Sequence, residues 1–407
     1  MKFAVFSFRF AVKNCSEHKI LFISYSLSTR ALSLLTFTAN WVLTTANFFI
    51  MPKPYTQQYR ALTDKIQVWA NELGFQQIGI SNIDLKEHEQ HLNDWLEAGL
   101  HGEMDYMSRH GSMRSHPEEL VDGTIRVISV RMDYLPPELT PPQDVLRNKN
   151  KGYISRYALG RDYHKLIRKR LQQLAKKIEQ SIGEFGYRVF TDSAPVLEKA
   201  LAEKANLGWI GKHTNLINKK AGSWFFLGEI FTDLPLPITN DSTDNHCGKC
   251  TACIDICPTQ AIIAPFKVDA TRCISYLTIE LHGSIPVEFR ADIGNRIYGC
   301  DDCQLVCPWN RFAKSTQEQD FFSRHQLDSA DLLDLFSWDE ATFLKNTEGS
   351  AIRRIGHQRW LRNIAIALGN APYSEETLDC LRKKKRQVSE MVAEHIDWAM
   401  DTQVSKR

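Results

Sequence analysis

The chain has 407 residues, enough for two to four domains of ordinary size, and its composition is that of a soluble globular protein. The formal net charge of +2 singles out no class of partner. Ten cysteines are present, and eight of them lie between Cys247 and Cys307, whereas Cys15 and Cys380 are isolated. Because disulfide frameworks belong to short secreted chains, a local cysteine cluster in a long chain favours a metal site.

Residues 1–50 differ from the rest of the chain. Residues 31–52 carry no charge and could just span a bilayer, but Ser, Thr and Asn interrupt them and no A-x-A cleavage site is present. Met51 opens a stretch that reads as an ordinary protein start followed by an amphipathic helix. We therefore expect residues 1–50 to be a disordered extension or the product of a misplaced gene start. A membrane anchor and an ordered extension are the alternatives.

Helices and strands alternate between residues 51 and 236. Apolar residues three and four apart predict the helices, and short β-rich runs predict the strands. In chain order we expect a helix over 57–73 that ends at Gly74, a strand in FQQIGIS, a helix over 88–98, a strand over 126–134, a loop over 136–143, a helix over 162–182, a strand over 187–192, and a helix over 195–205 with Pro195 in its first turn. This alternation predicts an α/β domain.

Residues 316–407 read as helical. Trp360, Ile364 and Leu368 fall at helical spacing and suit helices that pack in pairs. We expect stacked helical hairpins, that is, a HEAT-like repeat. The predicted domains are therefore an extension, an α/β catalytic domain, a cysteine cassette and a helical repeat, over residues 1–50, 51–236, 237–315 and 316–407.

The cassette contains two related cysteine runs. CGKCTACIDICP, which begins at Cys247, has the C-x2-C-x2-C-x3-C-P spacing of bacterial ferredoxins. CDDCQLVCP, which begins at Cys300, lacks one member, and Cys273 can supply it. The last cysteine of each run precedes a proline and turns toward the other cluster. The pattern predicts a ferredoxin-like α+β module with two 4Fe-4S clusters, one held by Cys247, Cys250, Cys253 and Cys307 and the other by Cys257, Cys273, Cys300 and Cys303.

Zinc is the alternative metal, since C-x2-C pairs also bind zinc, but the full ferredoxin spacing argues against it. The α/β segment has neither a G-x-G-x-x-G after a strand nor a Walker loop, so no nucleotide site is indicated. The cysteines alone therefore predict an electron path without naming the acceptor.

Several segments in and around the cassette resemble epoxyqueuosine reductase. They are FTDSAPVLEKALAEKANLGWIGKHTNLIN, GSWFFLGEIFTD, CISYLTIE, YGCDDCQLVCPWN and RRIGHQRWLRNIAIALGNA. The resemblance covers about residues 55–400 in order, and residues 1–50 have no counterpart in it. It implies an oxidoreductase that removes the epoxide oxygen of epoxyqueuosine at the wobble position of transfer RNA, with cobalamin and two 4Fe-4S clusters. Low-potential clusters can reduce cobalamin stepwise, and the cofactor carries the difficult chemistry.

The resemblance also assigns residues. Asp192 falls at the position of the family's catalytic aspartate, at the end of a predicted strand, where α/β folds gather their ligands. From the residues alone Asp192 reads as a helix N-cap. To donate a proton near neutral pH it would need a pKa raised by burial against the corrin. Arg114, His213 and Ser275 fall where the family contacts cobalamin, although each also suits an ordinary polar position.

No D-x-H-x-x-G motif supplies a lower histidine ligand for cobalt. DYHKLI, residues 162–167, begins like that motif but ends in isoleucine. We therefore expect cobalamin with its own base displaced and no protein histidine on the cobalt.

Transfer RNA requires positive charge, and the C-terminal part supplies two clusters. Arg353, Arg354, Arg359 and Arg362 surround Trp360 and His357, and we expect them to bind tRNA. RKKKR, residues 382–386, reads more simply as a solvated face. The target base should be splayed out into the cobalamin pocket.

Two other functions compete with the reductase interpretation. A reductive dehalogenase shares cobalamin and paired clusters but carries a twin-arginine signal, which residues 1–50 lack. A ferredoxin-type carrier without catalysis would not need Asp192 or an α/β domain. We expect a cytoplasmic monomer that receives electrons from an external low-potential donor and contacts no membrane.

Overall fold

The computed structural model describes residues 8–13, 20–25, 57–239 and 244–407. The chain divides into two compact units, residues 1–51 and 52–407. In the first unit, β1 (Phe8–Lys13) pairs antiparallel with β2 (Ile20–Tyr25). The charge-free segment 31–52, on which the interpretation of residues 1–50 depends, lies outside the described residues. Among those that are described, no helix is long and apolar enough to cross a membrane.

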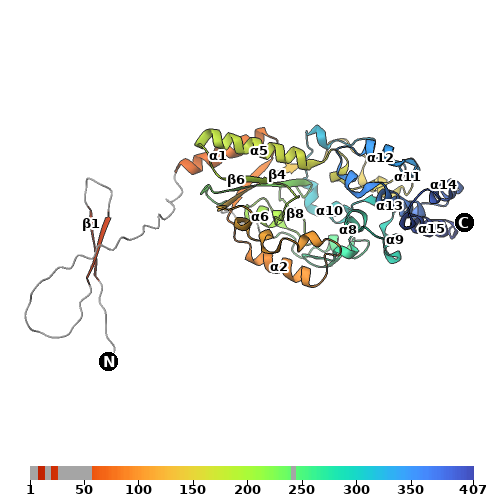
Figure 1. Cartoon of the computed structure of the whole chain (residues 1–407), viewed down its shortest axis with the longest axis horizontal. Coiled ribbons are helices and arrows are strands. Elements are labelled where there is room, and N and C mark those ends of the chain that lie inside the picture. Colours follow the sequence, from red (N-terminus) through yellow and green to blue (C-terminus); the bar gives the residue numbers. More distant parts are fainter. Residues whose placement is uncertain (1–7, 14–19, 26–56, 240–243) are drawn as a thin grey trace, which may run out of the picture. The chain divides into compact units, whose positions relative to one another are not determined.

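A four-stranded antiparallel sheet is the centre of the N-terminal part of the second unit (Figure 1). Its strands lie in the order β3 (Gln77–Ser81), β4 (Arg126–Asp133), β9 (Phe225–Thr232) and β6 (Tyr187–Phe190). The sequence predicted helices and strands here but not the direction of the strands, and the sheet is antiparallel throughout. Strands β4 and β6 run in the same direction, but β9 lies between them and opposes both.

Helices cover both faces of this sheet. Helices α1 (Gln57–Glu72) and α5 (Tyr163–Ile182) cover one face, and α6 (Glu198–Lys204) covers the other (Figure 1). Helix α5 lies close to β9, because a Cβ at Gly228 would come within 2.9 Å of the side chains of Ile167 and Leu171. The remaining elements of this part are α2 (Lys86–Glu97), α3 (Pro117–Leu120), α4 (Pro142–Arg147), β5 (Tyr153–Ile154), β7 (Trp209–Ile210) and β8 (Leu216–Ile217).

The cysteine segment is tied to the sheet domain by strand pairing. Strand β12 (Arg296–Tyr298) runs parallel to β5, with Arg296 opposite Tyr153. Residues 52–407 accordingly form one compact unit. The other elements here are α7 (Ala252–Asp255), β10 (Ile262–Ala264), β11 (Lys267–Val268), α8 (Ile274–Ile279), α9 (Val287–Ile293) and α10 (Asp302–Leu305).

The C-terminal part is helical, as expected. Its buried core is formed by apolar residues of α13, among them Trp360 and Ile364, against Val392 and Ile396 of α15. That these helices form a HEAT-like repeat stays a prediction. They are α11 (Leu332–Ser337), α12 (Glu340–Asn346), α13 (Gly356–Asn370), α14 (Glu375–Lys385) and α15 (Glu390–Val404).

The predicted helix over 195–205 begins later than expected. Helix α6 starts at Glu198, and its N-cap is Leu197, which makes no side-chain cap hydrogen bond. Residues 191–197 instead form an irregular loop, and Pro195 lies before the helix. Asp192 has a left-handed backbone, with φ of 53°. The N-cap interpretation of Asp192 is therefore wrong, and its side chain is available for other contacts.

Candidate active site and cluster pockets

A cavity of about 1460 Å³ lies between three parts of the chain. They are the domain built on the sheet β3-β4-β9-β6, the cysteine segment over residues 247–307, and the turn Ala351–Ile355 before α13. This volume exceeds the range of roughly 300–1000 Å³ for pockets of drug-sized ligands, so the cavity has room for a large ligand. Asp192, His213 and Ser275, three of the residues predicted from the sequence, lie on its wall. Arg353 and Arg354 line it as well.

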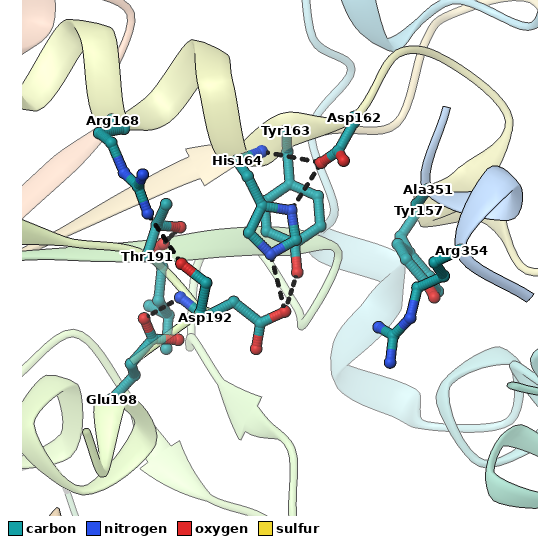
Figure 2. Close-up of polar contacts among 12 residues, drawn as sticks. Tyr157, Asp162, Tyr163, His164, Arg168, Thr191, Asp192, Glu198, Ala351 and Arg354 are labelled. Atoms are coloured by element: carbon teal, nitrogen blue, oxygen red, sulfur yellow. Dashed lines mark hydrogen bonds and ion pairs between the residues drawn. The ribbon is translucent and has the colours of Figure 1, made fainter. Parts of the chain in front are cut away.

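Two residues at the start of α5 hold the Asp192 carboxylate (Figure 2). The Tyr163 hydroxyl donates a hydrogen bond to Oδ2, and Nε2 of His164 lies 3.3 Å from the same oxygen. Nδ1 of His164 lies 2.6 Å from Oδ1 of Asp162 on its other side. The Asp162 carboxylate also caps α5 by accepting the backbone N–H of His164 at 3.1 Å. The imidazole of His164 thus bridges two carboxylates.

The charge of this cluster follows from its contacts. Burial lowers the pKa of His164, but hydrogen bonds and charges from Asp162 and Asp192 outweigh burial and raise the pKa to about 9. His164 is therefore an imidazolium at neutral pH and donates to both carboxylates. The rings of Tyr163 and His164 stack, with centroids 4.2 Å apart, which fixes both donors.

The protein groups around Asp192 lower its pKa, and the rise expected from burial against the corrin stays a prediction. Burial acts to raise it, but hydrogen bonds from His164 and Tyr163 and the charges of His164 and Arg354 lower the net pKa. The carboxyl side chain is also 52% exposed on the cavity wall, so water reaches it. The sequence did not reveal His164, the cation beside Asp192.

The eight cysteines of the cassette fall into two groups. One group lines the large cavity, and the other surrounds a separate pocket of about 40 Å³ together with His246 and Trp309. The grouping is the one that the crossed C-P runs predict. The inner group, on the large cavity, is Cys257, Cys273, Cys300 and Cys303, and the outer group is Cys247, Cys250, Cys253 and Cys307. The inner group therefore lies on the same cavity as Asp192.

His213 and Ser275 have the chemistry to hold a polar ligand. His213 is 4% exposed, and its Nδ1 accepts the N–H of Asn215 at 3.2 Å. Burial, with the charge of Lys199, lowers the pKa of His213 to about 4, so the ring is neutral and carries its proton on Nε2. Within the described ranges that Nε2 has no hydrogen-bond partner. Ser275 lies at the start of α8 on the same cavity.

Contrary to expectation, Arg114 does not line the cavity. It is 7% exposed in the turn over residues 111–114, and its Nη2 donates to the carbonyl of Tyr106 at 2.8 Å. A place on the wall of the cofactor cavity is therefore not supported for this residue.

Known proteins resemble this chain in sequence and in fold. Residues 114–193 match the family model for epoxyqueuosine reductase QueG, DUF1730, and residues 246–310 match the model for a 4Fe-4S double cluster binding domain. The epoxyqueuosine reductase of Pseudomonas aeruginosa is 61% identical over 339 residues, 83% of this chain and 94% of that protein. The chain belongs to the epoxyqueuosine reductase family. The Vibrio cholerae and Escherichia coli enzymes are 60% and 56% identical over 86% and 85% of the chain, which cover 94% and 90% of those enzymes.

Solved epoxyqueuosine reductases share the fold. The Streptococcus thermophilus enzyme is 28% identical, with a TM-score of 0.75 over 85% of this chain and 91% of that one. A second, crystallised with an epoxyqueuosine-modified tRNA stem loop, is 24% identical with a TM-score of 0.77 over the same shares. The family prediction is confirmed and the dehalogenase and carrier alternatives are set aside. The double cluster match likewise confirms iron–sulfur clusters against zinc.

The four arginines predicted to bind tRNA separate into two kinds. Arg353 and Arg354 are exposed, and Arg354 lies 2.5 Å from Glu280 and near Asp192 (Figure 2). Arg362 is fully buried, and its guanidinium donates to the carbonyls of Leu277, Leu281 and Gly283. Leu277 lies in the last turn of α8, and Leu281 and Gly283 follow the helix, where carbonyls lack intrahelical partners.

Contact of Arg362 with RNA is therefore excluded in this reductase fold. Arg359 is also largely occupied, because it donates to the carbonyls of Ile279, Arg354 and Ile355. The sequence alone does not show which of these arginines are exposed and which are buried, because α13 is buried on almost every side.

Sequence reasoning missed the residues around Asp192 in this family member. Asp162, Tyr163 and His164 were considered only as a failed cobalt-ligand motif. A histidine flanked by an aspartate at the start of a helix was the available signal. Glu198 and Glu229 gave none, yet Glu198 accepts the backbone N–H of Asp192 (Figure 2).

Proposed function

We propose that this chain reduces the epoxide of epoxyqueuosine in transfer RNA to queuosine, with Asp192 delivering a proton to the departing oxygen. The observation that carries the proposal is the shared cavity wall. The inner cysteine group, the source of electrons, and Asp192, the source of a proton, face the same space. The relative crystallised with an epoxyqueuosine-modified tRNA stem loop supports tRNA as the substrate.

Cobalamin fits the cavity on the chemistry of its wall. The buried, unpartnered Nε2–H of His213 and the hydroxyl of Ser275 are positioned to bind polar groups of such a ligand. Because Nδ1 of His213 accepts a hydrogen bond and Nε2 is protonated, His213 has no lone pair for cobalt. His164 is engaged on both nitrogens. Cobalamin bound here would supply a strongly nucleophilic cobalt centre and a path for the electrons.

The overall reaction sets what the protein must provide. Removing an epoxide oxygen as water to leave a carbon–carbon double bond consumes two electrons and two protons. Asp192 is ionised in the open cavity, so its proton must come from a neighbour. His164 is that neighbour, since its charged ring already donates toward Oδ2 of Asp192. When ligands displace water from the half-exposed carboxyl, the neutral His164–Asp192 pair becomes favoured, because desolvation disfavours both charges.

Positive charge at the cavity mouth suits an RNA backbone. Arg353 and Arg354 are exposed and line the cavity, whereas no residue of RKKKR lines it. We assign tRNA contacts to Arg353 and Arg354. A base bound at the cavity must leave the anticodon stack.

Analysis of tRNA nucleosides tests the function in the cell. A strain lacking the chain should accumulate epoxyqueuosine and contain no queuosine, and the wild-type gene should restore queuosine. Normal queuosine in the deletion strain, with no second enzyme able to replace this chain, would contradict the proposal. Restoration by Lys176→Gln, an exposed substitution on α5, serves as the positive control.

A further inference from the structure

Glu229 is a buried acidic residue in the middle of the sheet. It lies in β9 opposite Ser129 of β4 and Phe190 of β6, and its exposure is 0%. Throughout residues 57–239 and 244–407, no N–H or O–H group donates to either of its carboxyl oxygens. A bare carboxylate in such a place is strongly disfavoured, and a buried acid without a partner holds its proton instead.

Glu198 lies directly beside Glu229. Its side chain projects from the first turn of α6, which packs against β9, and the two carboxyl groups interact with each other. Two carboxyl groups can approach in this way only with a proton between them. The same Glu198 carboxyl accepts the backbone N–H of Asp192 (Figure 2). A continuous chain of contacts therefore runs from the sheet interior to the catalytic loop.

We propose that Glu198 and Glu229 form a carboxyl pair that shares a proton and positions Asp192. Glu229 donates to Glu198, and Glu198 holds the amide of Asp192. This contact helps fix the left-handed backbone at Asp192, which is unfavourable for a residue with a side chain. The inference deepens the proposed function, because positioning matters only if Asp192 acts in the cavity.

The surrounding charges agree with a retained proton. Asp192 on the loop adds a third carboxylate, and His164 of α5 is the nearest cation that offsets it. Lys199 of α6 donates to the carbonyl of Thr214 at 2.8 Å, and the buried Oγ of Ser129 of β4 has no hydrogen-bond partner among the described residues. Burial, reinforced by Asp192, raises the pKa of Glu198 to about 7, and burial with Glu198 raises the pKa of Glu229 far above its ordinary value.

An infrared measurement tests the shared proton without any substrate. At pH 8 ordinary carboxyl groups are ionised, so a protonated carboxyl in the cluster-loaded protein gives a separate C=O band. Glu229→Gln should remove one such band from the wild-type spectrum. The exposed Glu184→Gln is the matched control and should leave the band intact. A wild-type spectrum whose carboxylic acid bands are unchanged by Glu229→Gln would overturn the shared proton.

Kinetics test the positioning role. The side-chain amide introduced by Glu229→Gln can donate to Glu198 permanently, so the rate of epoxide reduction by this variant should stay within about twofold of wild type. Glu229→Ala leaves Glu198 without a donor, and misplacement of Asp192 should lower the single-turnover rate about 100-fold with unchanged affinity for the RNA stem loop. Equal rates in the glutamine and alanine variants would refute positioning by the pair. An inactive wild type would refute the proposed function, while the infrared result would still stand.

Discussion

Replacing His164 by glutamine separates its charge from its hydrogen bonds. The pKa of His164 is raised from 6.5 to about 9, despite the opposing effect of burial. A rise of this size favours the charged ring by about 3 kcal/mol, at about 1.4 kcal/mol for each pH unit. Two carboxylates share this energy, and solvent screens the half-exposed Asp192, so we assign about 1 kcal/mol to the His164–Asp192 contact.

Two consequences follow for His164→Gln. The pKa of Asp192 should rise by about one pH unit, because its strongest partner loses its charge. Epoxide reduction should slow by about two orders of magnitude, because the glutamine cannot return a proton to Asp192. Single-turnover rates across pH 5–9, measured anaerobically with an epoxyqueuosine stem loop, give both quantities. Lys176→Gln, exposed on the same helix, should behave as wild type.

Stability gives an independent check with a definite sign. Because the folded state raises the pKa of His164, its contribution to stability is complete below about pH 6.5 and is lost as the pH rises through about 9. The melting temperatures of wild type and His164→Gln should therefore differ at pH 6 and converge above pH 9. Wild-type rates and an unchanged pH profile in His164→Gln would refute the proton supply proposed for this residue.

Three further predictions concern the clusters, the cofactor and the RNA. Cys307→Ser should damage the cluster held by Cys247, Cys250 and Cys253, as seen by electron paramagnetic resonance, whereas loss confined to the inner cluster would refute the crossed assignment. His213→Ala should weaken cobalamin binding about tenfold in an absorbance titration, since one buried donor is lost, and unchanged affinity would remove His213 from the site. Arg362→Met should lower the free energy of unfolding by about 3 kcal/mol, because three carbonyls lose their donor, and should leave RNA binding unchanged. Arg353→Ala should leave the free energy of unfolding unchanged, weaken RNA binding and reduce the salt dependence of RNA affinity.

Local signals in the sequence predicted the elements well. Helix α5 was expected over 162–182 and occupies Tyr163–Ile182, because its buried face repeats at helical spacing. The cysteine spacings likewise predicted which cysteines lie together, with the last cysteine of each run in the group of the other run.

Long-range contacts were the part that the sequence did not reveal. Strand β9 was not predicted, and its insertion between β4 and β6 makes the sheet antiparallel. Tyr163 reaches Asp192 across 29 residues of sequence, and together with His164 it lowers the pKa of Asp192. Arg362 looked like its exposed neighbours, because nothing in its own helix shows that the loop after α8 covers it.

Asp192 is the group that we propose to give a proton to the epoxide oxygen. Asp192→Asn keeps size and polarity but removes the acid, so the measurement is anaerobic single-turnover reduction of an epoxyqueuosine stem loop by wild type and this variant at pH 7. We predict a rate lower by about two to four orders of magnitude, with both clusters, cobalamin and RNA affinity retained. A variant that reduces the epoxide within about twofold of the wild-type rate would contradict the account.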